Sequence, residues 1–202
     1  MTLIIGITGG IGSGKSTFSN EVIKRGFKLL DSDKEVALLY KKPKKEFLEY
    51  LNKIGLRKSI KNKKIDKKII RETIFDDTQI KTKLEKYIFK IIRKKRKKII
   101  KKETKLKTKA IFFDVPLLFE NNLGKDFDII VSIISLKKNR LKRLKLTKKI
   151  SEKTNKKITR YQTSDVIRKS KSDIIIYNNG SLKDFLKKTN IVLDRIIEWE
   201  KL

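Results

Sequence analysis

Short apolar runs alternate along this chain with stretches in which apolar residues recur at helical spacing. Runs rich in β-branched residues predict buried strands, and they occur at residues 3–8, 27–31, 110–116, 127–134 and 172–180. Helical spacing occurs between them, at residues 15–25, 32–40 and 181–200. Strands that alternate with helices indicate a parallel sheet covered on both faces. The predicted fold class is therefore α/β.

A long stretch at residues 43–109 departs from this alternation. Its apolar residues predict helices near 47–54, 66–75 and 79–103. The last of these has one apolar stripe on an otherwise basic helix, formed by Ile80, Leu84, Tyr87, Ile88, Ile91 and Ile92. No strand pattern appears here, so we predict a helical insertion in a single domain whose core is residues 1–42, 110–135 and 172–202. Residues 137–163 are polar and basic and are also predicted to be helical.

The high positive charge of the chain has two possible interpretations. The 202 residues fit one domain, and their formal net charge is +31. Such a charge is typical of nucleic-acid binding. However, Lys dominates the basic residues and alanine occurs only twice, which favours compositional drift in an AT-rich genome and a lysine-covered surface. A nucleic-acid partner is therefore not expected.

Residue types that the chain lacks exclude several kinds of chemistry. It contains no Cys and no His, so thiolate and imidazole catalysis are excluded and carboxylates must act as any general base. No apolar run reaches the about 18 residues of a membrane span. The N-terminal residues do not resemble a signal peptide, so we expect a cytoplasmic protein without membrane contact.

A glycine-rich motif lies between the first predicted strand and the first predicted helix. It reads Gly9-Gly10-Ile11-Gly12-Ser13-Gly14-Lys15-Ser16-Thr17 and fits G-x-x-x-x-G-K-[ST]. Glycines let the backbone curl around an anion, and successive N–H groups then face phosphate oxygens. Lys15 is placed to reach the β and γ phosphates, and the Ser16 hydroxyl to ligate Mg²⁺. The motif predicts ATP and Mg²⁺ as cofactors.

Acidic residues follow two of the predicted strands. Asp31 and Asp33 come after the second strand, and Asp114 closes the strand at 110–116. The carboxyl edge of a parallel sheet is where ligands bind. Asp31 is equally explained as a helix N-cap, whereas Asp33 is our candidate for the carboxylate that faces an attacking hydroxyl. Asp114 either holds the water shell of Mg²⁺ or caps the strand end.

These features together resemble the dephospho-coenzyme A kinase family over residues 3–199. The matching blocks, at matching distances, are GITGGIGSGKST (6–17), DSD (31–33), RETIF (71–75), VPLLFE (115–120), RLKRL (140–144), Gln162 and YNNG (177–180). The resemblance implies a P-loop kinase that transfers the γ-phosphoryl group of ATP to the ribose 3′-hydroxyl of dephospho-coenzyme A. It also implies that residues 43–109 bind the coenzyme and that residues 136–164 form a lid.

The resemblance further assigns roles to single residues. Asp33 is implied as the base, and Lys15 and Arg143, with Arg140 assisting, as the groups that neutralise the transferred phosphoryl. Asn178 and Asn179 are implied near the adenine of ATP. The implied acceptor site comprises Asp33, Arg71, Pro116, Leu117, Leu118 and Phe119, with the last three offering apolar surface.

Two departures and three alternatives accompany this interpretation. Phe89-Lys90 stands where the family often has a His-Pro pair. Thr147 stands where the family usually has a second lid arginine, and a weaker clamp on the phosphate would follow. The alternatives are another nucleoside or nucleotide kinase of the same architecture, a basic nucleic-acid-binding ATPase, and a folded but inactive kinase. The oligomeric state does not follow from the sequence.

Overall fold

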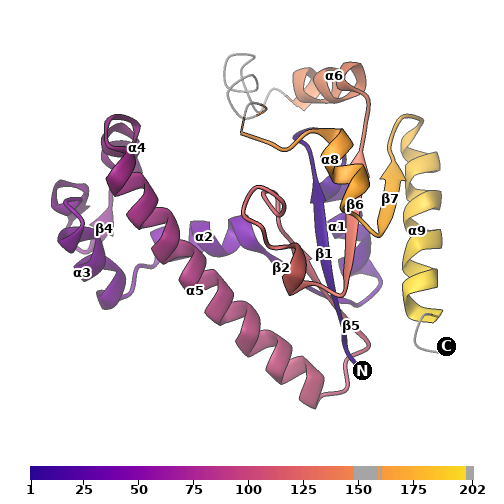
Figure 1. The fold of residues 1–202 in the computed structure, drawn as a ribbon, viewed down its shortest axis with the longest axis horizontal. Coiled ribbons are helices and arrows are strands. Elements are labelled where there is room, and N and C mark those ends of the chain that lie inside the picture. Colours follow the sequence, from indigo (N-terminus) through magenta and orange to yellow (C-terminus); the bar gives the residue numbers. More distant parts are fainter. Residues whose placement is uncertain (148–158, 160, 199–202) are drawn as a thin grey trace. The chain divides into compact units, whose positions relative to one another are not determined.

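A computed structural model describes residues 1–147, 159 and 161–198 (Figure 1). The chain divides into two compact units, one formed by residues 1–31 and 100–202 and the other by residues 32–99. Helix α2 (Ser32–Lys41) thus belongs to the second unit, whereas the sequence pattern assigned it to the core. Each unit has its own cluster of buried apolar side chains.

The first unit is built on a five-stranded parallel sheet (Figure 1). Its strands are β1 (Leu3–Gly9), β2 (Lys28–Asp31), β5 (Ala110–Asp114), β6 (Ile129–Ile134) and β7 (Ile174–Tyr177). They lie in the order β2-β5-β1-β6-β7, and every pairing is parallel. The predicted α/β class is therefore confirmed. Strand β5 ends two residues before Pro116, whose missing N–H cannot continue a ladder.

Two helices cover one face of this sheet. Helices α1 (Lys15–Lys24) and α9 (Leu182–Glu198) bury Phe18 and Phe185 against Ile5 and Ile7 of β1. On the other face, Gly6 leaves room for two large side chains. A Cβ atom at Gly6 would lie 2.9 Å from Leu118 Cδ1 and 2.9 Å from the Phe127 ring, so a larger residue would displace this packing.

Helix α9 begins with a reciprocal cap. The Asp184 N–H donates to Ser181 Oγ at 3.1 Å, and the Ser181 N–H donates to Asp184 Oδ2 at 3.2 Å. The Ser181 hydroxyl also donates to Asp184 Oδ2 at 2.6 Å. These bonds hold the pKa of Asp184 below its ordinary value, and they satisfy donors that the first turn of a helix leaves free.

We expect Ser181→Ala to lower the free energy of unfolding by about 1 kcal/mol, because it removes this cap. Because the pKa of Asp184 is lowered in the folded state, its ionised form stabilises the fold. This contribution to the free energy of unfolding is present above about pH 4 and is lost as the pH falls through the folded-state pKa. Denaturant unfolding of wild type and variant at pH 7 and pH 3 measures both effects. The difference in stability should narrow at pH 3, and Ser181→Asn, which caps as well as serine, should retain wild-type stability.

The second unit is mainly helical, as predicted. Besides α2 it contains α3 (Lys45–Lys53), α4 (Lys67–Asp76) and residues 78–99 of α5 (Thr78–Lys105). Phe47 and Leu51 of α3 are buried with Leu84 of α5. Tyr87 stacks on Tyr50 with a centroid distance of 3.8 Å. The apolar stripe of the long helix therefore packs on α3.

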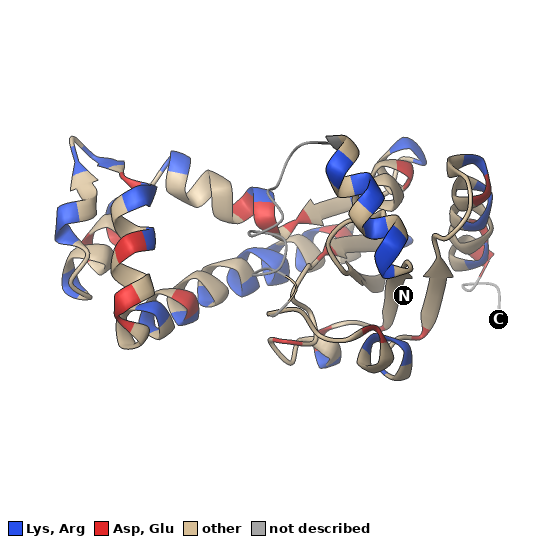
Figure 2. Ribbon diagram, turned by 90° about the horizontal axis from the view of Figure 1, so that it is seen from above, with Lys and Arg blue, Asp and Glu red and all other residues tan. Residues whose placement is uncertain are grey.

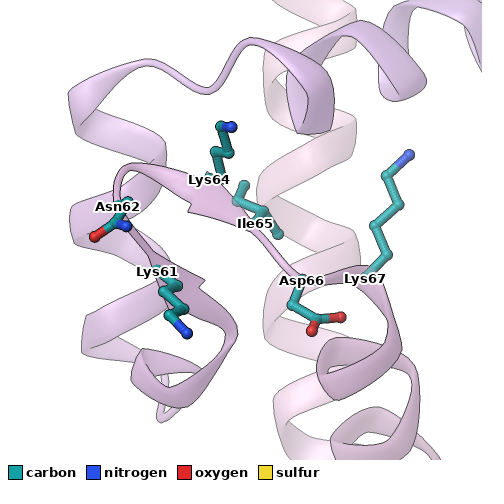
Figure 3. Close-up of a pocket in the computed structure, with 6 residues that line it drawn as sticks. All are labelled: Lys61, Asn62, Lys64, Ile65, Asp66 and Lys67. Atoms are coloured by element: carbon teal, nitrogen blue, oxygen red, sulfur yellow. The ribbon is translucent and has the colours of Figure 1, made fainter.

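The expectation that residues 43–109 contain no strand is wrong. Strands β3 (Ile60–Lys61) and β4 (Lys64–Ile65) form an antiparallel hairpin, drawn in Figure 3. Its two turn residues, Asn62 and Lys63, have φ angles of 50° and 59°. Positive φ at both positions produces the turn that matches strand twist, and Asn adopts it readily. The strands are too short to create an alternating apolar pattern.

A basic cavity of about 470 Å³ lies beside this hairpin (Figure 3). Lysines line it from both strands and from the start of α4, namely Lys61, Lys64 and Lys67. Asp66 also lines it and caps α4, since its Oδ1 accepts the Lys68 N–H at 2.8 Å. The lining side chains other than Ile65 are exposed, so this cavity is a shallow surface feature.

The predicted lid is described in part. Helix α6 (Lys137–Thr147) confirms that the first part of the predicted lid is helical. Residues 148–158 and 160 lie outside the described residues. Residues 161–164 form a turn and loop, and α8 (Asp165–Ser170), which the sequence reading missed, follows. The end of the predicted helix 181–200, with Trp199, also lies outside the described residues. None of the described helices combines the length and the apolar character that crossing a membrane requires.

Candidate functional site

The carboxyl ends of three neighbouring strands meet at one edge of the sheet. Strand β1 ends at Gly9, the first residue of the glycine-rich loop. Asp31 ends β2 and Asp114 ends β5, and these two residues are register partners. Parallel strands therefore place the loop and both acids at the edge where such sheets bind ligands.

The glycine-rich loop presents backbone N–H groups that have no internal acceptor. Gly12 and Gly14 have φ angles of 74° and 107°, which only glycine adopts without strain. Within the part of the chain that is described, no acceptor is found for the N–H groups of Gly12, Gly14, Lys15 and Ser16. The last two open helix α1, whose positive dipole end adds to the field of the loop. This arrangement fits a phosphate group.

Other loop residues are already engaged. The Ser13 N–H donates to the Gly10 carbonyl at 3.0 Å, and the Ser13 side chain is fully buried. The Ile11 N–H donates to Gln162 Oε1 at 3.0 Å. The Thr17 N–H donates to the Gly14 carbonyl at 3.0 Å. These three residues thus fold and hold the loop, and their assignment to the ATP site stays a prediction.

Lys15 is joined to the end of β5. Its Nζ forms an ion pair with Asp114 Oδ1, and the Ser19 hydroxyl donates to Asp114 Oδ2 at 2.9 Å. Asp114 is only 4% exposed, so its charge depends on these two partners. Ser19 was missed by the sequence reading, but it lies four residues after Lys15 and therefore on the same face of α1.

Arg143 of α6 ties the loop to the turn after β7. Its NH1 donates to the Gly12 carbonyl at 3.3 Å and to Ser135 Oγ at 3.0 Å. Its NH2 donates to the carbonyl and to Oδ1 of Asn178 at 2.9 and 3.0 Å. Burial lowers the pKa of Arg143, yet an arginine stays charged under such conditions. Asn178 Nδ2 completes the connection by donating to the Ser13 carbonyl at 2.8 Å.

Arg140 and Asn179 make further contacts near this connection. A Cβ atom at Gly10 would collide with Arg140 NH1, so the guanidinium lies directly against the loop. Arg140 NH2 also lies 3.7 Å from Asp165 Oδ2. Asn179 Oδ1 accepts the Leu136 N–H at 2.8 Å and so holds the segment that leads into α6.

The chain is similar to known proteins over most of its length. The profile of the dephospho-CoA kinase family matches residues 3–184. A dephospho-CoA kinase of Fusobacterium nucleatum is 40% identical over 186 residues, which cover 92% of this chain and 94% of that protein. The chain belongs to the dephospho-CoA kinase family.

Solved structures agree with this membership. A dephospho-CoA kinase from Campylobacter jejuni is 28% identical, has a TM-score of 0.76, and is matched over 99% of this chain and 100% of its own. A Thermus thermophilus protein called TT1252 matches with a TM-score of 0.79 at 23% identity, over 96% of this chain and 97% of its own. The second match shows the shared fold. The resemblance and the kinase family inferred from the sequence are therefore confirmed.

The block VPLLFE differs from what its resemblance to the family implied. Leu117 is 38% exposed, but Leu118 is 0% and Phe119 9% exposed. Leu118 packs into the space above Gly6, so it supports the sheet. The expectation that all three side chains offer apolar surface is therefore wrong for Leu118 and Phe119. Pro116 is half-buried, and its carbonyl accepts the Thr8 hydroxyl at 3.4 Å.

Two further candidates from the family resemblance lie in the helical unit. Asp33 is exposed in the first turn of α2, two residues after Asp31 ends β2. The positive end of the helix dipole favours a carboxylate there. Arg71 is exposed on α4, on the turn after the Asp66 cap. Thr147 ends α6, in agreement with the predicted lid helix.

Three charged residues near the loop were not singled out as site residues. Arg168 of α8 is 1% exposed and lies 3.0 Å from Asp165 Oδ1 and 3.5 Å from Glu120 Oε1. Glu120 ends the quoted block VPLLFE, which was a usable signal. Asp165 and Arg168 are three residues apart, but nothing in the sequence shows that an arginine in a lysine-rich chain is buried.

Proposed function

We propose that this chain transfers the γ-phosphoryl group of ATP to the ribose 3′-hydroxyl of dephospho-CoA, giving CoA and ADP in the cytoplasm. The observation that carries the proposal is the set of N–H groups at Gly12, Gly14, Lys15 and Ser16 that have no acceptor among the described residues, in a chain of the dephospho-CoA kinase family. Phosphate oxygens accept such N–H groups, and the helix dipole favours the negative charge.

The donor nucleotide is held by the loop and by groups that brace it. Arg143 and Asn178 hold the loop from outside, with Asn179 beside them near the adenine. The donor set also fits Mg²⁺, because Ser16 and Asp114 provide the hard oxygen ligands that this ion prefers, the acid through water. Mg²⁺ would supply charge neutralisation on the phosphates.

The reaction needs charge neutralisation and a proton acceptor. Lys15 and Arg140 neutralise the charge of the transferred group. Both terminal nitrogens of Arg143 donate hydrogen bonds to protein acceptors. The 3′-oxygen bonds to the γ-phosphorus as the bond to the β–γ bridging oxygen breaks, and Asp33 accepts the hydroxyl proton. Arg71, Pro116 and the exposed Leu117 contact the acceptor, and the segment 136–164 acts as a lid that excludes water.

The test is an acceptor screen at fixed ATP and Mg²⁺. Purified protein should convert dephospho-CoA to CoA, detected by mass and by a phosphate at the 3′ position. Nucleoside monophosphates and nucleosides serve as the alternative acceptors. Turnover of one of those without turnover of dephospho-CoA would overturn the proposal, and turnover of none would favour the inactive-kinase alternative.

The nucleic-acid alternative has a separate test. Lys and Arg are spread over nearly all the described helices, as Figure 2 shows, and are not gathered on one element. Such a distribution favours a solvated basic surface. Filter binding to duplex DNA and to RNA at about 50 and 200 mM salt should show weak retention that salt abolishes. Retention at the higher salt would support a nucleic-acid partner.

A further inference from the structure

The buried residue Arg168 is placed at the centre of four alternating charges. Its guanidinium contacts the carboxylates of Asp165 and Glu120, and Asp165 in turn lies near Arg140. Two positive and two negative charges make the group neutral. With its side chain 2% exposed, Arg168 is by far the most enclosed of the four. We call these four residues the Arg168 cluster.

One arm of the cluster leads to the loop through Glu120. Glu120 Oε1 accepts the Thr163 N–H at 2.5 Å, and the preceding residue, Gln162, accepts the Ile11 N–H at 3.0 Å. The carboxylate that anchors Arg168 therefore also fixes the segment that contacts the phosphate-binding loop. No other described residue holds the Thr163 N–H.

The second arm leads to the loop through Asp165. Its Oδ1 binds Arg168 and its Oδ2 faces Arg140, whose NH1 lies against Gly10. One carboxylate is thus shared between a buried arginine and the arginine that covers the loop. Among the described residues, Asp165 is the ion-pair partner of Arg140 NH2, at 3.7 Å. A displacement of Asp165 is therefore expected to displace Arg140.

The burial of Arg168 is not explained by stability alone. Its Nε has no hydrogen-bond partner among the described residues, and a buried donor without a partner costs free energy. Apolar residues of similar volume often replace buried ion pairs without loss of stability. Because the burial of Arg168 costs free energy, we look for its role in the positions that it imposes on its two carboxylate partners.

We propose that Arg168 is a positioning residue, which fixes Asp165 and Glu120 so that Arg140 and Gln162 are presented to the phosphate-binding loop. This inference rests on the proposed function, since it assumes that Arg140 neutralises the transferred phosphoryl group. A guanidinium held in advance neutralises charge without reorganising during the reaction. Arg168 itself touches no reacting atom.

The test compares Asp165→Asn and Arg168→Met in two backgrounds, wild type and Arg140→Met. In the wild type each substitution should lower kcat roughly tenfold, because a small displacement of the Arg140 guanidinium weakens its interaction with the transferred group. The KM for dephospho-CoA should change by less than about twofold. In Arg140→Met, where no guanidinium remains to be positioned, Asp165→Asn should lower kcat by less than about twofold, whereas Arg168→Met should keep the part of its loss that acts through Glu120 and Gln162. The same tenfold loss for Asp165→Asn in both backgrounds would overturn the proposal.

Controls separate positioning from folding. Lys171→Met removes an exposed positive charge next to α8 without touching the cluster and should keep wild-type kcat. If Arg168→Met does not fold, Asp165→Asn decides the question, because Asp165 is only half-buried and asparagine has its shape. Arg168→Lys keeps the charge but loses the fork, so its kcat should remain below that of the wild type.

A binding measurement distinguishes failure of this inference from failure of the proposed function. If the wild type forms no CoA, the proposed function fails, but calorimetric titration with a non-hydrolysable ATP analogue still reports on Arg140. Asp165→Asn should weaken that binding at least about threefold in the wild type and leave it unchanged in Arg140→Met. Equal weakening in both backgrounds contradicts the positioning role.

Discussion

Replacing Lys15 by methionine is expected to lower kcat for CoA formation roughly 10³-fold, since it removes a fixed positive charge from the phosphate site. The substitution has a second effect that the structure makes explicit. Lys15 pairs with Asp114, which is 4% exposed and whose other partner among the described residues is the Ser19 hydroxyl. Removing one partner of a buried pair costs on the order of 3 kcal/mol. Initial rates and thermal unfolding should therefore both change.

The double variant Lys15→Met/Asp114→Asn separates the two effects. Asparagine removes the stranded charge and can still accept the Ser19 hydroxyl, so most of the lost stability should return. Activity should not return, because the positive charge at the phosphates is still missing. Recovery of turnover in the double variant would mean that Lys15 serves only to neutralise Asp114. The matched control is Lys24→Met on the same helix, because the Lys24 side chain is 69% exposed where it pairs with Glu21, and an ion pair with an exposed lysine contributes little.

The sheet and the loop were predictable because their signals are local. A run of β-branched residues before Gly9 and a helical pattern after Lys15 define a strand–loop–helix unit by themselves. The strand order was not predicted, because it depends on which distant segments pair. The parallel character did follow from the alternation of strands and helices.

Other features depend on packing that no short pattern records. Leu118 was expected to offer apolar surface because its block resembles the acceptor site of the family, but the space that Gly6 leaves above β1 buries it. The hairpin at Ile60–Ile65 was missed because two strands of two residues each create no period. The burial of Arg168 depends on Glu120, 48 residues earlier. In each case the partner lies far away in the sequence or the element is too short to show a pattern.

Replacing Asp33 by asparagine is expected to lower kcat for CoA formation between roughly 10²- and 10⁴-fold, the range in which a general base contributes. Asparagine is the same size and can still accept a hydrogen bond, but it cannot take the proton of the 3′-hydroxyl. Asp33 is exposed at the start of α2, so the substitution should leave the thermal unfolding temperature nearly unchanged. KM for ATP should also change little, because the role assigned to Asp33 concerns the acceptor and not the nucleotide.

Two comparisons make the Asp33 assignment specific. Slow hydrolysis of ATP without dephospho-CoA should be similar in wild type and Asp33→Asn, since no 3′-hydroxyl takes part. The matched control is Asp31→Asn, which removes an acid at the end of β2, the register partner of Asp114, only two residues away. A larger loss in Asp31→Asn than in Asp33→Asn would transfer the role of base to the strand end, where the carboxylate is fixed by the sheet. A larger loss in Asp33→Asn keeps it on the first turn of the helix, where the dipole favours the carboxylate.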